Sequence, residues 1–133
     1  HIKAILGVGD LETMRNVAKA SLVCMMADAD FIKTSTGKET INANLNNSLV
    51  MLRMIREFHE ITRKKIGFKP AGGISSAKLV IEFLILVLEE LGSEWINPKL
   101  LRIGASSLLI DIERQLYHFA VGRYANKDKI AIG

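Results

Sequence analysis

Two lysines in this sequence each stand at the end of a short apolar stretch: Lys33 ends "DFIK" and Lys69 ends "GFK". If the two stretches are neighbouring strands of one sheet, their backbones lie about 4.8 Å apart. Two ammonium groups at that spacing repel each other, and partial burial disfavours the charged form, so both effects lower the pKa of a lysine amine. A neutral amine can attack an aldehyde or a ketone and form a Schiff base. The pair therefore predicts an amine nucleophile with a cationic neighbour.

The loops that follow these strands, and a third loop further along the chain, are rich in glycine and hydroxyl residues: "TSTGK", "PAGG" and "GASS". Glycine lets backbone N–H groups approach an oxygen-rich ligand closely. The two serines of "GASS" open a predicted helix, whose N-terminus carries a positive partial charge. The candidate anion-binding residues are Gly37, Lys38, Gly72, Gly73, Gly104, Ser106 and Ser107. Together with the lysines, these loops predict an enzyme that binds a phosphorylated carbonyl compound through an imine.

Simpler interpretations of the same residues remain open. A single lysine at a strand end is usually a solvated cap, and a Gly-Gly pair is usually only a turn. The sequence "GASS" is also one that simply caps a helix. Two lysines on one face of successive strands, each before a glycine loop, make the catalytic interpretation about as strong as the structural one.

Composition argues against several other classes of protein. The net charge is +4, but the basic residues are dispersed and aromatic residues make up only 6%, so we expect no nucleic-acid partner. No apolar run approaches the roughly 20 residues of a membrane helix. His59 and His118 have no metal-spaced partner and Cys24 is the only cysteine, so we expect no metal, no other cofactor and no internal disulfide. A cytoplasmic location fits these features.

The elements that must position the lysines alternate along the chain. Four stretches read as strands: "HIKAIL", "DFIKT", "KIGFKP" and "LLRIG". Four stretches read as helices: "LETMRNVAKASLVCMMA", the segment from Leu45 to Ile61, "SAKLVIEFLILVLEELG" and "SSLLIDIERQLYHFAVG", with Ser75 or Ser76 as N-cap and Gly92 as stop of the third. This alternation predicts an α/β fold with a parallel sheet. A closed (β/α)8 TIM barrel needs eight such units, so the sequence predicts either a small open α/β domain or half of a barrel.

Side-chain alternation assigns the two lysines to one face of that sheet. Ile32 points away from Lys33, and Phe68 points away from Lys69, because successive residues of a strand face opposite sides. The apolar face suits packing against helices. The lysines are therefore expected on the other face, toward the interior and at the mouth of a barrel.

The motifs "DFIKTSTGK", "GFKPAGGI" and "RIGASSLL" resemble the three C-terminal signatures of the 2-deoxyribose-5-phosphate aldolase family, and the longer stretches look like its eukaryotic branch. The resemblance runs from His1 nearly to Tyr124. It implies a class I, Schiff-base aldolase on a TIM barrel. Such an enzyme reversibly cleaves 2-deoxy-D-ribose 5-phosphate to acetaldehyde and D-glyceraldehyde 3-phosphate, without a metal, in deoxyribonucleotide catabolism.

Matching the motifs position by position implies a role for each site residue. Lys33 corresponds to the Schiff-base lysine, Lys69 to the lysine that perturbs it, and Lys38 to a further lysine of the site. The phosphate-binding positions of the family fall on Gly37, Gly72, Gly73, Gly104, Ser106 and Ser107. A small phosphorylated sugar is thus the expected partner.

The resemblance also sets an expectation about completeness. Residues 1–133 read as the C-terminal half of a single aldolase barrel domain, about its last four βα units, and the family's proton-transfer aspartate has no counterpart here. Open sheet edges and an uncovered interior favour association, so a homo-oligomer is one expected outcome. The competing hypothesis is a non-catalytic half-barrel, a fragment or paralogue that only binds phosphate or self-associates.

Overall fold

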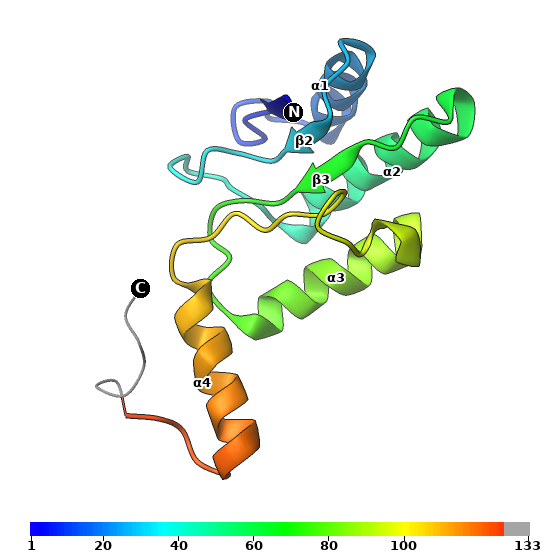
Figure 1. Cartoon of the computed structure of the whole chain (residues 1–133). Helices are drawn as coiled ribbons and strands as arrows, with labels where there is room; N and C mark the ends of the chain where they lie inside the picture. The colour runs from blue at the N-terminus through cyan, green and yellow to red at the C-terminus, as the bar shows by residue number, and fades with distance from the viewer. Residues whose placement is uncertain (127–133) are drawn as a thin grey trace.

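The computed structural model describes residues 1–126, and these form strands that alternate with helices (Figure 1). The elements are β1 (Lys3–Ile5), α1 (Met14–Met26), β2 (Phe31–Lys33), α2 (Leu45–Thr62), β3 (Gly67–Lys69), α3 (Ala77–Leu91), the short 3-10 helix η1 (Ser93–Trp95) and α4 (Leu108–Val121). The strands make one parallel sheet in the order β1-β2-β3. The predicted α/β class and parallel sheet are confirmed.

The prediction of a fourth regular strand at "LLRIG" is wrong. This segment runs parallel to β3 but makes only two isolated bridges, Phe68 with Leu101 and Ala71 with Gly104. Phe68 N donates to Leu100 O at 2.8 Å, and Gly104 N donates to Pro70 O at the same distance. Between these bonds the ladder needs an N–H from residue 70, which is a proline and has none to donate. The sequence still lies beside β3, so its loop still reaches the same edge of the sheet.

The two faces of the sheet differ as side-chain alternation predicts. Ile32 and Phe68 are fully buried against Met51, Leu52 and other apolar residues of the helices. On the opposite face the ring of Phe31 lies across Gly67: a Cβ at Gly67 would come within 2.3 Å of that ring. Glycine at this position therefore leaves the space that the aromatic ring occupies.

Each of the first three α-helices begins at a side-chain cap. The side chains of Thr13, Asn44 and Ser76 accept hydrogen bonds from the backbone N–H three residues on, at the starts of α1, α2 and α3. Of the two serines expected to cap α3, Ser76 is the one that does so. Gly92 ends α3 at φ 84°, a left-handed conformation that favours glycine.

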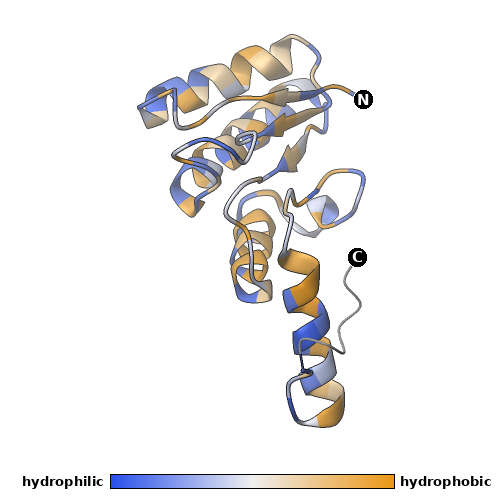
Figure 2. Cartoon of the chain, turned by 90° about the vertical axis from the view of Figure 1, so that its left-hand side faces the viewer, coloured by the Kyte–Doolittle hydropathy of each residue, from blue (hydrophilic) through white to orange (hydrophobic). Residues whose placement is uncertain are grey.

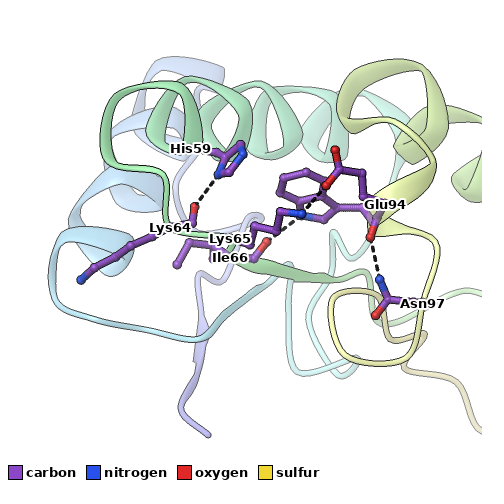
Figure 3. Close-up of polar contacts among 7 residues, drawn as sticks. His59, Lys64, Lys65, Ile66, Glu94 and Asn97 are labelled. Atoms are coloured by element: carbon purple, nitrogen blue, oxygen red, sulfur yellow. Dashed lines mark hydrogen bonds and ion pairs between the residues drawn. The ribbon is translucent and has the colours of Figure 1, made fainter.

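The turn after α3 is anchored through Trp95, which is 3% exposed. Its Nε1 donates to Ile66 O at 2.9 Å, while the ring of His59 packs edge-on against the indole. The Lys65 ammonium lies over the indole ring and pairs with the Glu94 carboxylate; Figure 3 shows Lys65 and Glu94 together with the neighbouring polar contacts. These contacts fix the residues just before β3, and so fix where that strand enters the sheet.

Helix α4 projects away from the rest of the chain (Figures 1 and 2). Its only buried residue is Leu108, in the first turn. Leu109, Leu116 and Phe119 are exposed along its length, where Figure 2 shows apolar residues. Within residues 1–126, none of the helices combines the length and the apolar character needed to cross a membrane.

The fit of Phe31 over Gly67 gives a first prediction. Gly67→Ala would place a methyl group inside the volume of the ring, so we expect a loss of about 1–3 kcal/mol in the free energy of unfolding. Denaturant titration of the complete protein measures this loss. Adding Phe31→Leu, which shortens the facing side chain, should recover part of it; a double variant less stable than either single one would contradict the proposed contact.

Candidate active site

Lys33 and Lys69 are directly paired in the register of β2 and β3. Both side chains are half-buried, on the face opposite the apolar core. Burial lowers the pKa of Lys69, and the positive charges of Lys33, Lys3 and Arg102 lower it further, in that order. The predicted pair of neighbouring amines is therefore present, with the lowered pKa on the amine of β3.

A cavity of about 420 Å³ opens at the carboxyl ends of these strands. Lys33 contributes to its wall from the end of β2. Its other lining residues are Thr36, Gly37, Lys38, Ala71, Gly72, Gly73, Ile74, Ser75, Gly104, Ala105, Ser106 and Ser107. The structure thus brings together Lys33 and all seven residues predicted to bind an anion.

Lys69 is the one predicted site residue that does not line the cavity in the described part of the chain. Its side chain passes beneath the third loop: a Cβ at Gly104 would lie 3.3 Å from Lys69 Cε and 2.6 Å from the Cβ of Ala71. Gly104 therefore makes room for the lysine stem and for the "PAGG" loop together. Lys69 therefore lies beside Lys33 in the sheet but outside the lining of the cavity.

Backbone contacts of Ala71 lock the first two loops together. The hydroxyl of Thr34 accepts from Ala71 N at 2.9 Å and donates to Ala71 O at 3.1 Å. Thr34 and Ser35 are fully buried. Since Thr34 follows Lys33 directly, the end of β2 cannot move independently of the wall that Gly72 and Gly73 form.

The backbone N–H groups at the starts of α3 and α4, which lie beside the cavity, differ in their hydrogen-bond partners. At α3, Ser76 Oγ accepts from Leu79 N and the Asp111 carboxylate accepts from Ala77 N at 2.7 Å. At α4, the N-cap residue Ser107 makes no side-chain hydrogen bond to the first turn. The free N–H groups of α4 are the ones available to an anion in the cavity.

Sequence reasoning missed several cavity residues. Thr36 and Ser75 add hydroxyl groups, and Ala71, Ile74 and Ala105 complete the wall. Each sits inside a loop that had already been singled out, so treating the loops as whole segments would have found them.

Comparison with known proteins decides the family. Residues 6–110 match the family described as "DeoC/LacD family aldolase". The chain belongs to this family. It is 62% identical to "Deoxyribose-phosphate aldolase" from Homo sapiens and from Mus musculus, over 94% of this chain and 39% of each relative. The chain thus spans about two fifths of the length of these curated relatives.

Solved structures agree on the fold. A crystal structure of a candidate deoxyribose-phosphate aldolase from Toxoplasma gondii superposes with a TM-score of 0.74 at 23% identity, over 91% of this chain and 48% of that one. The apo form gives a TM-score of 0.76 at 25% identity, over 84% and 43%. The arrangement of the four βα segments is therefore an aldolase-family arrangement.

The lowered pKa of Lys69 predicts a pH-dependent effect on stability. Between that lowered pKa and the ordinary value of 10.5, the unfolded chain binds more protons than the folded one, so stability rises with pH. Replacing Lys69 with methionine removes the repulsion, and we expect the variant to be more stable than the parent near neutral pH. The advantage should shrink as pH rises toward 10.5, where the parent lysine loses its charge in either state.

Unfolding midpoints measured from pH 6 to pH 10 check this expectation. Lys78→Met, which removes a charge from the exposed surface of α3, is the matched control and should show no such trend. A Lys69→Met advantage that stays constant across the range would mean that packing, rather than charge, is responsible.

Proposed function

We propose that the protein containing this chain is a class I deoxyribose-phosphate aldolase that reversibly cleaves 2-deoxy-D-ribose 5-phosphate to acetaldehyde and D-glyceraldehyde 3-phosphate. The observation that carries the proposal is the paired register of Lys33 and Lys69 beside a glycine- and serine-lined cavity. The names of the 62% identical relatives support the same activity. A role in deoxyribonucleotide catabolism and a cytoplasmic location belong to this proposal.

Lys33 is the proposed nucleophile because its amine lines the cavity. Before it attacks the C1 aldehyde of the open-chain sugar, it must lose a proton. Water accepts that proton. Because burial and its cationic neighbours lower the pKa of Lys69, Lys69 holds its own proton weakly and can donate it to the hydroxyl group that leaves as water. Addition of the amine and loss of water then give an iminium ion.

The iminium ion accepts the electron pair of the C2–C3 bond when that bond breaks. The O3 proton leaves to a base, which releases glyceraldehyde 3-phosphate as an aldehyde. The resulting enamine takes a proton at C2, and water hydrolyses the imine to acetaldehyde and free Lys33. Every step uses only proton transfer and the one covalent lysine, so no redox partner is required.

The substrate phosphate is assigned to the far wall of the cavity. Gly72 and Gly73 have φ of 87° and 76°, conformations that present backbone rather than side chain to a ligand. The unoccupied start of α4 at Ser106 and Ser107 adds a positive partial charge, and Lys38 adds a full one. A dianionic phosphate suits this combination.

The described segments are proposed as the last four units of an eight-unit barrel. The chain covers 39% of its curated relatives, and one face of the three-stranded sheet has the half-buried lysines rather than a second apolar layer. In a closed barrel that face points inward. We also propose that the protein self-associates through the exposed apolar surfaces of α3 and α4.

Trapping of the imine tests the catalytic assignment. We expect borohydride reduction of the complete protein in the presence of acetaldehyde to add a two-carbon group to Lys33, because Lys33 both lines the cavity and is paired with Lys69 in the register. Peptide mass spectrometry locates the adduct. Modification of Lys69 or Lys38 with Lys33 unmodified would overturn the assignment, and no adduct with any lysine would favour a non-catalytic, phosphate-binding protein.

A negative charge introduced at the start of α4 tests the phosphate assignment. Ser106→Asp places a carboxylate where the phosphate is expected, so KM for 2-deoxyribose 5-phosphate should rise by about 100-fold or more, as for like charges brought into a site. The value of kcat/KM for unphosphorylated 2-deoxyribose should change far less. Equal losses for the two sugars would place the phosphate elsewhere.

A further inference from the structure

Asn42 lies beside two neighbouring loops of the cavity wall, which come so close that a Cβ at Gly37 would lie 3.6 Å from Gly72 Cα. Its side chain is half-buried, and in the described part of the chain it does not itself line the cavity. It touches Gly72 from outside: a Cβ at Gly72 would come within 2.6 Å of three Asn42 side-chain atoms. The Asn42 amide thus supports the back of the glycine wall.

The same amide is hydrogen-bonded to the loop that follows Lys33. Asn42 Nδ2 donates to Glu39 O at 2.6 Å, and Ser35 Oγ lies 2.9 Å from Asn42 Oδ1. Ser35 Oγ also lies 2.8 Å from Ala71 O, and that carbonyl also accepts from Thr34 Oγ1 and from Ala43 N. The single Ser35 hydroxyl therefore joins Asn42 and Ala71 in one hydrogen-bond network.

Glu39 extends this arrangement to the cavity. Its Oε1 accepts from both Thr36 N, at 2.9 Å, and Thr36 Oγ1, at 3.1 Å. Thr36 lines the cavity together with Gly37 and Lys38. The shape of the "TSTGK" loop therefore depends on residues 39 and 42, which hold it from the side away from the ligand.

We propose that Asn42 is a positioning residue that sets the spacing between the Lys38 loop and the Gly72–Gly73 wall, and thereby the affinity of the cavity for a phosphorylated ligand. The inference rests on the proposed function for its substrate, but its geometry depends only on the cavity. Asn42 acts through Gly72 and the loop at Lys38, and it has no contact with the amine of Lys33 among its hydrogen bonds.

Asn42→Ala in the complete protein removes both hydrogen bonds and the contact with Gly72. We expect KM for 2-deoxyribose 5-phosphate to rise by about three- to tenfold, which is the scale of one neutral hydrogen bond, because the two lost bonds act on the cavity only indirectly, through the loops. The value of kcat should change less, and unphosphorylated 2-deoxyribose should show little change in either constant. A purely structural role would lower the unfolding midpoint without this difference between the two sugars.

Asn46→Ala is the matched control, because it makes the same chemical change at an exposed position on α2. It should leave both constants unchanged. Adding Ser35→Ala to Asn42→Ala should produce no further rise in KM, since the two side chains share one hydrogen bond. If Asn42→Ala does not fold, Asn42→Asp keeps the size of the side chain, removes the donor and adds a negative charge, with Asn46→Asp as its control for charge.

Binding of inorganic phosphate, measured by calorimetry, separates this inference from the proposed function. We expect the dissociation constant for phosphate to rise in Asn42→Ala and to stay unchanged in Asn46→Ala, whether or not the parent protein cleaves the sugar. A parent that binds phosphate but does not cleave deoxyribose 5-phosphate would remove the proposed function and leave the role of Asn42 standing. Unchanged phosphate affinity in Asn42→Ala, equal losses for both sugars, or a parent that binds no phosphate would overturn the inference.

Discussion

The parallel register that sets Lys33 opposite Lys69 is the constraint on which the rest of the site depends. It puts the lysine stems side by side at the end of the sheet, and it places Phe31 opposite Gly67 two residues earlier. A slip of one residue would turn the lysines into the apolar layer and expose Ile32 and Phe68. The register is therefore held by the core on one face, and on the other face it pairs the two lysines.

That arrangement sets two cations together where neutral residues would be more stable. The lowered pKa of Lys69 is the sign of this repulsion and of burial acting together. The cost is offset elsewhere, by the buried packing of Ile32 and Phe68 and by the hydrogen bonds of Thr34 to Ala71. Functional sites often contain charges that lower stability, and the well-packed residues around them compensate for that loss.

The sequence was sufficient to predict the parts of the site that follow from strand parity. Lys33, Lys69 and the three loops could be placed because side chains alternate along a strand and parallel strands end at one edge. The fourth strand failed because Pro70 lies in the neighbouring strand's ladder and removes a donor that "LLRIG" alone does not reveal. The contact of Asn42 with Gly72 was also out of reach, since it joins residues 30 positions apart through one rotamer.

The described residues supply the groups that line the cavity, but they supply few free carboxylates near Lys33 for proton transfer. Among the described residues, the cavity is lined by Lys33 at the end of β2 and by three loops, including the free start of α4. Among the carboxylates close to β2, Asp28 pairs with Lys64 and Asp30 accepts from Ile2 N. Glu39 uses Oε1 to hold Thr36, and its buried Oε2 has no hydrogen-bond partner among the described residues. Asp28 and Asp30 also precede β2 and so lie at the opposite end of the strand from Lys33. The described residues therefore supply the three loops that line the cavity, and they supply Lys69 as the direct partner of Lys33 in the register of β2 and β3.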